Sequence, residues 1–453
     1  MGFEQDFLDL YQTFLTEVSI LSAVDSRGLS GPLFDRSTSR NFIVYNAIQV
    51  KLGETDIEDV PSPFKDTVAN FSSKIDVQKN TEENSVGVGS KDPFAKRIIA
   101  EFDTMMQQEN RKSEYVGVFK VTNFTNLFES TLTALCSWSL KYFEPKSNKI
   151  DTQSVNFKDF GRFNSIEELR TFALSKYING LTYRSAGEWI VEIANIIDPK
   201  ITKKKGFKSG LDQLTELYLR RNLFVHNSGK VNYIYLASIP TALKKEKEYQ
   251  FDSEEYITAD DDYIKLSFSQ GISVINLFFQ NRIEYVAQKL EQDKESLNKF
   301  FGELNNLALE LYRQNYFKEG NMFFQVTAEL AKKYLGEKDD TVFLYYYNKY
   351  LGLLLSGELN NSHRLAINKL FTYTKKLSWW DSFEKYNTVL SESSLTQNAD
   401  DFCDTAIEIA QELNNGNNSD KQNLADLMQW PMLKIIENKT KWIKFVDSLY
   451  DFK

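Results

Sequence analysis

The sequence contains few glycines and prolines for its length. Among 453 residues there are 20 Gly and 8 Pro, whereas loop-rich β-sandwiches and barrels depend on these residues at their many turns. Hydrophobic residues account for 42 % of the chain and charged residues for 26 %, which is ordinary for a globular protein with substantial cores. The composition therefore predicts an all-α fold built from long helices, over more than one domain.

The chain also lacks the apolar runs that mark membrane and secretory segments. No stretch reaches the roughly 18 uninterrupted apolar residues that a membrane helix needs, and the nearest approach, 342–355, is interrupted by Asn348 and Lys349. The N-terminal segment carries acidic side chains where a signal peptide has a basic start and an apolar core. We therefore expect a cytoplasmic protein with no membrane partner.

Cysteine and histidine are scarce. The two cysteines, Cys136 and Cys403, lie far apart in helix-like contexts, which predicts reduced thiols buried in a core. The two histidines, His226 and His363, leave little material for a histidine-based metal site, so we expect neither a metal nor another cofactor. Because the formal net charge is −9, a nucleic-acid partner would need a local basic patch.

Apolar residues at three- and four-residue intervals predict helices along most of the chain. Serine before such a pattern is typical of a helix N-cap. The predicted helices are 3–24, a segment that starts at Pro93, 123–143, and segments that start at Ser165, at Ser185 and near Ser209.

The chain is predicted to divide where dense charge interrupts the helical pattern. Residues 242–262 are rich in lysine, glutamate and aspartate, which is typical of a solvated linker. The predicted units are an N-terminal helical arm with an irregular polar insertion at 53–92 (1–94), a helical domain (95–241), the charged linker (242–262) and a C-terminal α-helical domain (263–453).

The C-terminal region is weakly repetitive. Residues 307–330 resemble a tetratricopeptide unit, with Asn315 in the turn between two helices. Similar turns at Gly357 and Asn398 give steps of 42 and 41 residues, longer than the roughly 34 of that repeat. A helical-repeat array and an ordinary helical bundle both fit this pattern.

One segment, 217–229, combines an apolar stripe with unusual polar residues. The stripe Leu217, Tyr218 and Val225 predicts the core face of a helix, and Arg221 falls on it. A charged side chain in a core costs stability unless it is paired or lines a site. On a helix Asn222 and His226 are neighbours, whereas Arg221 and His226 differ by about 140°.

A purely structural interpretation is available for this segment. His226 would then lie at the helix end that Asn227-Ser228-Gly229 predicts, and Arg221 would pair with a carboxylate such as Glu216. The pattern as a whole favours a functional interpretation.

The string Arg221-Asn222-x-x-x-His226 resembles the HEPN superfamily, whose hallmark is R-x4-6-H, often with a polar residue after the arginine. The run from His226 through Asn227 and Gly229 to Asn232 resembles the defence-associated branch of that superfamily. Glu129 matches the acidic residue that is usual there on a preceding helix. The resemblance covers about residues 95–240, and it implies a HEPN helical bundle.

The resemblance implies metal-independent RNA cleavage at a composite site between two chains. Arg221, Asn222 and His226 would be catalytic, with Glu129, Asn227 and Tyr233 in support. The side-chain chemistry agrees, since histidine exchanges protons near neutral pH and arginine binds phosphate oxygens. Because each chain offers one motif histidine, we expect a homodimer that supplies two.

Basic residues gather around this segment. Between Lys200 and Lys230 there are eight lysines and arginines against two acidic residues, a net charge of +6 over 31 residues. Such a patch is typical of phosphate binding. We predict that the following residues contact an RNA substrate: Lys203, Lys204, Lys205, Lys208, Arg220 and Lys230.

The leading hypothesis is an endoribonuclease that acts as a phage-defence (abortive-infection) or toxin effector. Its C-terminal helical domain would bind a protein sensor or an antitoxin partner. A competing hypothesis is a catalytically inactive HEPN dimer that serves as a protein-binding scaffold or regulatory subunit. A third is substrate binding for a separately encoded nucleotidyltransferase.

Overall fold

The computed structural model describes residues 2–24, 34–80, 85–143, 162–337, 339–356 and 399–416, with residue 365, 424–425, 427–428, 433 and 435–450. Within these ranges the regular elements are helices, apart from one two-stranded antiparallel sheet. The predicted all-α class is therefore confirmed. No helix in these ranges is long and apolar enough to cross a membrane.

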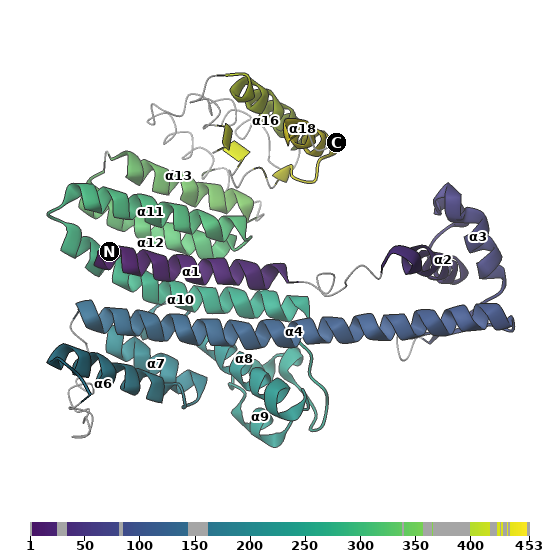
Figure 1. Ribbon diagram of the computed structural model, residues 1–453, viewed down its shortest axis with the longest axis horizontal. Coiled ribbons are helices and arrows are strands. Elements are labelled where there is room, and N and C mark those ends of the chain that lie inside the picture. The colour runs from purple at the N-terminus through teal and green to yellow at the C-terminus, as the bar shows by residue number, and fades with distance from the viewer. Residues whose placement is uncertain are drawn as a thin grey trace.

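Three long helices lie side by side through the middle of the molecule (Figure 1). They are α1 (Phe3–Ala23), α4 (Pro93–Tyr142) and α10 (Asp261–Leu290). The two helical segments predicted from Pro93 and over 123–143 are parts of α4, which runs for 50 residues without a break.

Shorter helices cover both sides of this central group (Figure 1). On one side lie α6 (Ile166–Leu181), α7 (Ala186–Ile197), α8 (Phe207–Asn227) and α9 (Tyr233–Ser238). On the other lie α11 (Lys294–Arg313), α12 (Phe317–Leu335) and α13 (Asp340–Leu355).

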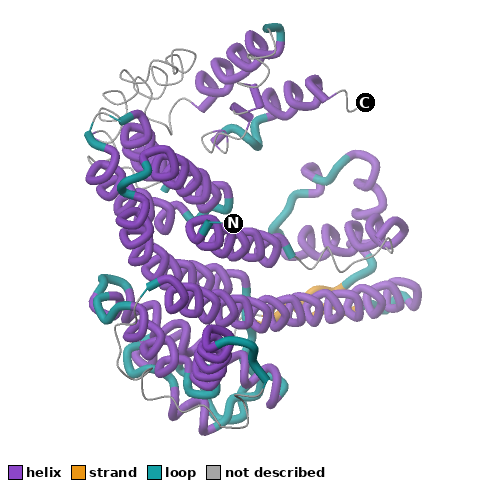
Figure 2. Tube along the Cα trace, turned by 60° about the vertical axis from the view of Figure 1, so that its left-hand side comes forward, coloured by secondary structure: helices purple, strands orange, loops and turns teal. Residues whose placement is uncertain are grey.

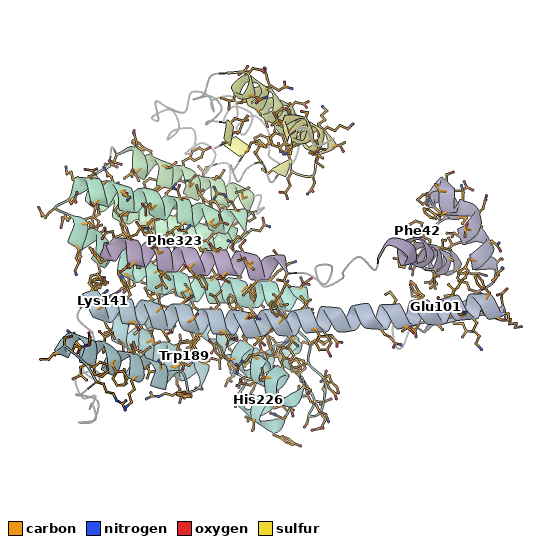
Figure 3. All side chains as sticks on the ribbon, in the orientation of Figure 1. Phe42, Glu101, Lys141, Trp189, His226 and Phe323 are labelled. Carbon is orange, nitrogen blue, oxygen red and sulfur yellow. The ribbon has the colours of Figure 1, made fainter. Side chains whose placement is uncertain are left out.

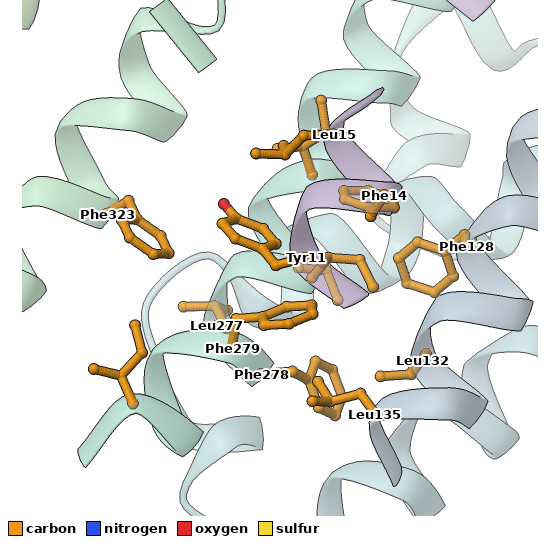
Figure 4. Packing of buried hydrophobic residues seen from close by; sticks show 14 of the residues in the cluster. Tyr11, Phe14, Leu15, Phe128, Leu132, Leu135, Leu277, Phe278, Phe279 and Phe323 are labelled. Atoms are coloured by element: carbon orange, nitrogen blue, oxygen red, sulfur yellow. The ribbon is translucent and has the colours of Figure 1, made fainter. Parts of the chain in front are cut away.

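A single hydrophobic core joins the N-terminal and C-terminal helices. Tyr11 of α1 packs between Phe279 of α10, at 4.5 Å between ring centroids, and Phe323 of α12, at 5.3 Å. Figure 4 shows Phe128 of α4 in the same cluster. Burial of aromatic rings contributes strongly to stability, so helices from both sides of residues 242–262 depend on one core.

The predicted domain split at 242–262 is consequently not confirmed. The charged side chains of this segment face solvent, but Leu243, Tyr249 and Ile257 are buried in a small core with Leu223 and Val231. The segment contains two short 3-10 turns, η3 (Leu243–Lys245) and η4 (Lys247–Tyr249). It is a packed connection between α9 and α10.

A separate small core lies at the N-terminal end of α4. It contains residues of α2 (Phe34–Leu52), η1 (Ile57–Asp59), α3 (Ser62–Ser73), β1 (Asp76–Asn80), β2 (Ser85–Gly89) and the first turns of α4. The strands pair with Val77 opposite Val88, and Figure 2 shows them beside α4. The prediction of an irregular insertion over 53–92 is therefore wrong for α3 and for the hairpin.

Several predicted helix boundaries are confirmed. Ser165 caps α6, and Ser185 caps α7 with Glu188 in a capping box. Asn315 occupies the turn between α11 and α12 with a φ of 66°. The predicted turns at Gly357 and Asn398, and His363, lie outside the described residues. Two further helices, α16 (Ala399–Asn414) and α18 (Thr440–Tyr450), share a second core with α13.

Candidate active site at the end of helix α8

Backbone geometry ends α8 immediately after the motif histidine. Ser228 and Gly229 have φ values of 51° and 80°, and the Gly229 amide donates to the Leu223 carbonyl over 3.0 Å. The Asn227 side-chain amide donates to the Lys230 carbonyl and closes the turn. Left-handed backbone of this kind is typical of a helix C-terminus, so Asn227 shapes the turn and His226 is not needed as the cap.

The turn after α8 is anchored to the segment that precedes α10. The Val231 amide donates to the Glu255 carbonyl over 2.8 Å, and the Ile257 amide donates to the Gly229 carbonyl over 2.9 Å. Lys230 forms an ion pair with Glu254, and its hydrogen bond with that carboxylate raises the pKa of Lys230. Lys230, predicted to contact RNA, is thus already paired with an acidic group.

Arg220 is the buried arginine of this helix. Its side chain is in contact with Glu216 over 2.8 Å (Nε to Oε1) and donates through Nη1 to the Thr258 carbonyl over 2.6 Å. Its guanidinium lies 3.6 Å from the centre of the Tyr263 ring. With 4 % of its surface exposed, Arg220 cannot reach a bound RNA, and the prediction of an RNA contact there is corrected.

Glu216 is the centre of this buried cluster. It is fully buried and accepts hydrogen bonds from the hydroxyls of Tyr235 and Tyr263, each over 2.6 Å, besides the bond from Arg220. Its oxygens are thereby committed within the core, and the suggested pairing of Glu216 with Arg221 does not occur.

The remaining motif residues lie on the accessible side of α8. Asn222 and His226 are exposed, and Arg221 is half-buried and donates to the Asn222 side-chain oxygen over 3.2 Å. Val225, predicted in the core stripe, is 47 % exposed, and Leu223 occupies the core position instead. Figure 3 places His226 near the junction of α8 and α9, on the opposite side of α4 from α1.

Helix α4 brings Glu129 close to the motif. The Tyr218 hydroxyl donates to the Thr125 carbonyl of α4 over 2.8 Å. Burial raises the pKa of Tyr218, the charge of Glu129 raises it further, and the charge of Arg221 opposes this effect. Glu129 and Arg221 therefore both lie within electrostatic reach of one phenol, although no direct ion pair joins them in the described part of the chain.

The lysine-rich segment lies at the other end of α8. Lys203 ends the 3-10 turn η2 (Ile201–Lys203), Lys204 and Lys205 follow it, and Lys208 is in the first turn of α8, all four with exposed side chains. Lys208 and His226 are 18 residues apart on one helix, which corresponds to about 27 Å. The basic residues between Lys200 and Lys230 therefore do not form one continuous patch around the motif.

Exposed apolar side chains accompany the motif. Tyr233 was predicted from the sequence as a supporting residue, whereas Ile234 was not singled out. Tyr233 and Ile234, in the first turn of α9, are 79 % and 75 % exposed. Asn232 caps this helix by accepting a hydrogen bond from the Tyr235 amide, and buried Tyr235 sets the inward face. Asn232 before the apolar run 233–236 was the sequence signal that could have predicted the start of α9. Tyr233 and Ile234 would then occupy the first turn of that helix.

No group of three or more His, Cys, Asp or Glu side chains arranged to hold a metal occurs among the residues that the structure describes. Comparisons of the chain with protein-family models, with curated proteins and with solved structures find no match.

Proposed function

We propose that the protein is a metal-independent endoribonuclease of the HEPN type, with Arg221, Asn222 and His226 as catalytic residues. One observation carries the proposal: Asn222 and His226 are exposed and one helical turn apart at the end of α8, Arg221 donates a hydrogen bond to Asn222, and the turn that ends the helix uses none of these three side chains. The turn is closed by backbone bonds and Asn227, and the buried carboxylate nearby is neutralised by Arg220. Polar residues without a structural task are candidates for chemistry.

The proposed reaction is cleavage through the ribose 2′-hydroxyl. The 2′-oxygen loses its proton to a histidine and attacks the phosphorus, and the bond from phosphorus to the 5′-oxygen breaks as that oxygen gains a proton. Arg221 stabilises the charge on the non-bridging oxygens, and Asn222, to which Arg221 donates a hydrogen bond, holds its guanidinium. The products are a 2′,3′-cyclic phosphate and a 5′-hydroxyl.

We propose a homodimer, because one chain supplies one motif histidine and the reaction needs an acid and a base. The exposed apolar side chains of Val225, Tyr233 and Ile234 lie within eight residues of His226 in the chain and offer a surface that pairing of two chains would bury. Two copies of the motif would then face each other. Glu129 and Tyr233 are proposed as supporting residues of this composite site.

The exposed lysines at the start of α8 are proposed as a second contact region for RNA. Because about 27 Å separates Lys208 from His226, they would bind RNA distant from the cleaved bond. Their removal should weaken RNA binding and its salt dependence without changing the products.

The test combines RNA cleavage with thermal melting of the purified protein. Loss of one acid–base group typically slows a reaction about 10²- to 10⁴-fold, so His226→Ala should lose cleavage and melt like the parent, since the side chain is exposed. Arg221→Ala should behave in the same way. Leu217→Ala is the stability control, because truncating this buried side chain should lower the free energy of unfolding by about 2–5 kcal/mol.

Excess EDTA separates this reaction from metal-dependent cleavage. Activity should persist and leave 2′,3′-cyclic phosphate ends. Strict dependence on Mg²⁺, with 5′-phosphate ends, would refute the proposal. So would a His226→Ala variant that unfolds as readily as Leu217→Ala.

The same exposed apolar surface also favours a second candidate function, a non-catalytic HEPN scaffold that binds another protein. A dimeric protein without RNA cleavage, whose partner binding survives His226→Ala, would establish the scaffold. As a nuclease, the protein is proposed to be a cytoplasmic toxin or phage-defence effector, with a sensor or antitoxin on its C-terminal helices.

A further inference from the structure

A cavity of about 350 Å³ lies between α1, α4 and α6, apart from the proposed cleavage site. All three helices contribute to its lining, with positions 6 and 10 on α1, 134, 137, 138, 140, 141 and 142 on α4, and 170, 171, 174 and 175 on α6. Its volume is at the lower end of the range of about 300–1,000 Å³ for small-molecule sites. The cavity therefore has the dimensions of a ligand pocket.

One part of the lining is apolar and rigid. Leu10, Trp138 and Leu174 form it, one from each helix. The Trp138 indole donates through Nε1 to the Phe3 carbonyl over 3.0 Å and packs on Phe7 at 4.9 Å between ring centroids. A fixed indole beside two leucines suits the planar or apolar body of a ligand.

Another part of the lining is cationic. Lys141 and Arg170 both have exposed side chains at the cavity. The Lys141 ammonium lies 4.7 Å from the centre of the Tyr142 ring. Arg170 has no ion-pair or hydrogen-bond partner among the described residues, and the same holds for the Ser175 hydroxyl. Two cations and an uncommitted hydroxyl at one cavity provide donors for a phosphate or carboxylate group.

The lining also contains one acceptor of opposite charge. Asp6 accepts a hydrogen bond from the Tyr142 hydroxyl over 3.1 Å through Oδ2. The hydrogen bond with Tyr142 raises the pKa of Lys141, and the charge of Asp6 contributes in the same direction. The remaining oxygen of Asp6 repels a second anionic group and favours a ligand that donates a hydrogen bond.

We infer that this cavity binds a small organic anion of the size and chemistry of a nucleoside monophosphate. The phosphate binds Lys141 and Arg170, and the base packs against Trp138 and the two leucines. An amino or hydroxyl group of the nucleoside donates to Asp6. The inference does not depend on ribonuclease activity.

The experiment is isothermal titration calorimetry of the full-length protein with AMP, GMP, CMP and UMP. At least one monophosphate should bind, and the corresponding nucleoside, which lacks the phosphate, should bind at least about tenfold more weakly. Charge-assisted hydrogen bonds of this kind are worth about tenfold or more in affinity. Arg170→Ala and Lys141→Ala should therefore each lower the affinity for the monophosphate by that factor.

Matched variants distinguish the cavity from the surface around it. Lys176→Ala removes an exposed cation of α6 that does not line the cavity and should leave binding unchanged. Ser175→Phe keeps both cations and fills the cavity, and it should abolish binding while the melting temperature shows that the variant is folded.

Three outcomes would overturn the inference: no heat from any of the four monophosphates at millimolar concentration, equal affinity for the nucleoside, or unchanged affinity in Arg170→Ala. Should Ser175→Phe fail to fold, the Arg170→Ala titration decides alone.

Discussion

Two adjacent arginines of α8 have opposite environments. Successive residues of a helix differ by about 100°, so when Arg220 points into the core, Arg221 points toward the surface. The sequence contained a signal for this difference, because Glu216 is four residues before Arg220 and such pairs meet on one helix face. The apolar stripe through Tyr218 and Val225 instead placed Arg221 inward. The spacing of apolar residues alone therefore could not decide which of the two adjacent arginines faces the core.

The buried pair of Glu216 and Arg220 predicts a large effect of a single substitution. Glu216→Ala leaves a desolvated guanidinium without its carboxylate, which typically costs about 3–5 kcal/mol. Glu254→Ala is the control, because it breaks the exposed pair with Lys230 and should cost at most about 1 kcal/mol. Urea denaturation measures both. Equal losses of stability in the two variants would mean that the buried pair contributes no more to stability than the exposed pair.

Cys136 predicts a dependence of stability on alkaline pH. Burial raises the pKa of Cys136 from 9.0 to about 12, with Arg282 opposing the shift. An acid whose folded pKa is raised contributes stability that is present below its unfolded pKa and is lost as the pH rises. The urea concentration at the unfolding midpoint should therefore decrease as the pH is raised from about 9 to about 12. The decrease should be smaller in Cys136→Ala.

A reactivity measurement gives a separate check on the same thiol. Cys136 and Cys403 are both free and buried, so neither should react with a disulfide reagent in the native protein at pH 8. Both should react once guanidinium unfolds the chain. Rapid labelling of the native protein would contradict the burial of these thiols.

At the scale of elements, local signals were sufficient for some boundaries and not for others. The starts of α6 and α7 were predicted because Ser165 and Ser185 act within one helical turn. The hairpin of β1 and β2 was missed, since strands such as Asp76–Asn80 contain few β-formers and depend on a partner strand. The middle of α4 was missed because its polar residues near 107–112 interrupt the apolar stripe while remaining good helix formers.

Alanine substitutions at two helical glycines are predicted to change stability in opposite directions. A Cβ at Gly117 of α4 would lie 2.2 Å from the Ala259 carbonyl oxygen, whereas one at Gly302 of α11 meets nothing within 4 Å. Alanine in a helix is favoured over glycine by about 0.8–1.0 kcal/mol. Gly302→Ala should therefore stabilise the protein by roughly that amount. Gly117→Ala should destabilise it, because backbone must move.

Thermal melting of the two alanine variants side by side checks this prediction. The parent melting temperature should lie between theirs. A stabilised Gly117→Ala variant would mean that the segment before α10 separates easily from α4, and that the close approach at Ala259 contributes little to the fold.

At the scale of the molecule, the candidate site depends on residues of the predicted linker itself. The turn after His226 is held by backbone bonds to residues 255 and 257, and the Arg220 guanidinium is bound by the Thr258 carbonyl. Charge density at 242–262 predicted a boundary because lysine, glutamate and aspartate together outnumber the apolar residues there. Which of the few apolar residues are buried depends on helices distant in sequence, and composition carries no information about that.

The dependence of both halves on one core leads to the last prediction, which concerns truncation. A fragment of residues 1–241 lacks α10 and leaves Tyr11 without Phe279, so its apolar surface has no cover. We expect it to be unfolded or aggregated, with no cooperative melt in circular dichroism. A fragment of residues 1–356 keeps α10–α13 and all residues of the main core, and it should melt cooperatively. If 1–241 instead folds as a stable unit, residues 242–262 are a true domain boundary, and the bonds from residues 255 and 257 are dispensable for the shape of the site.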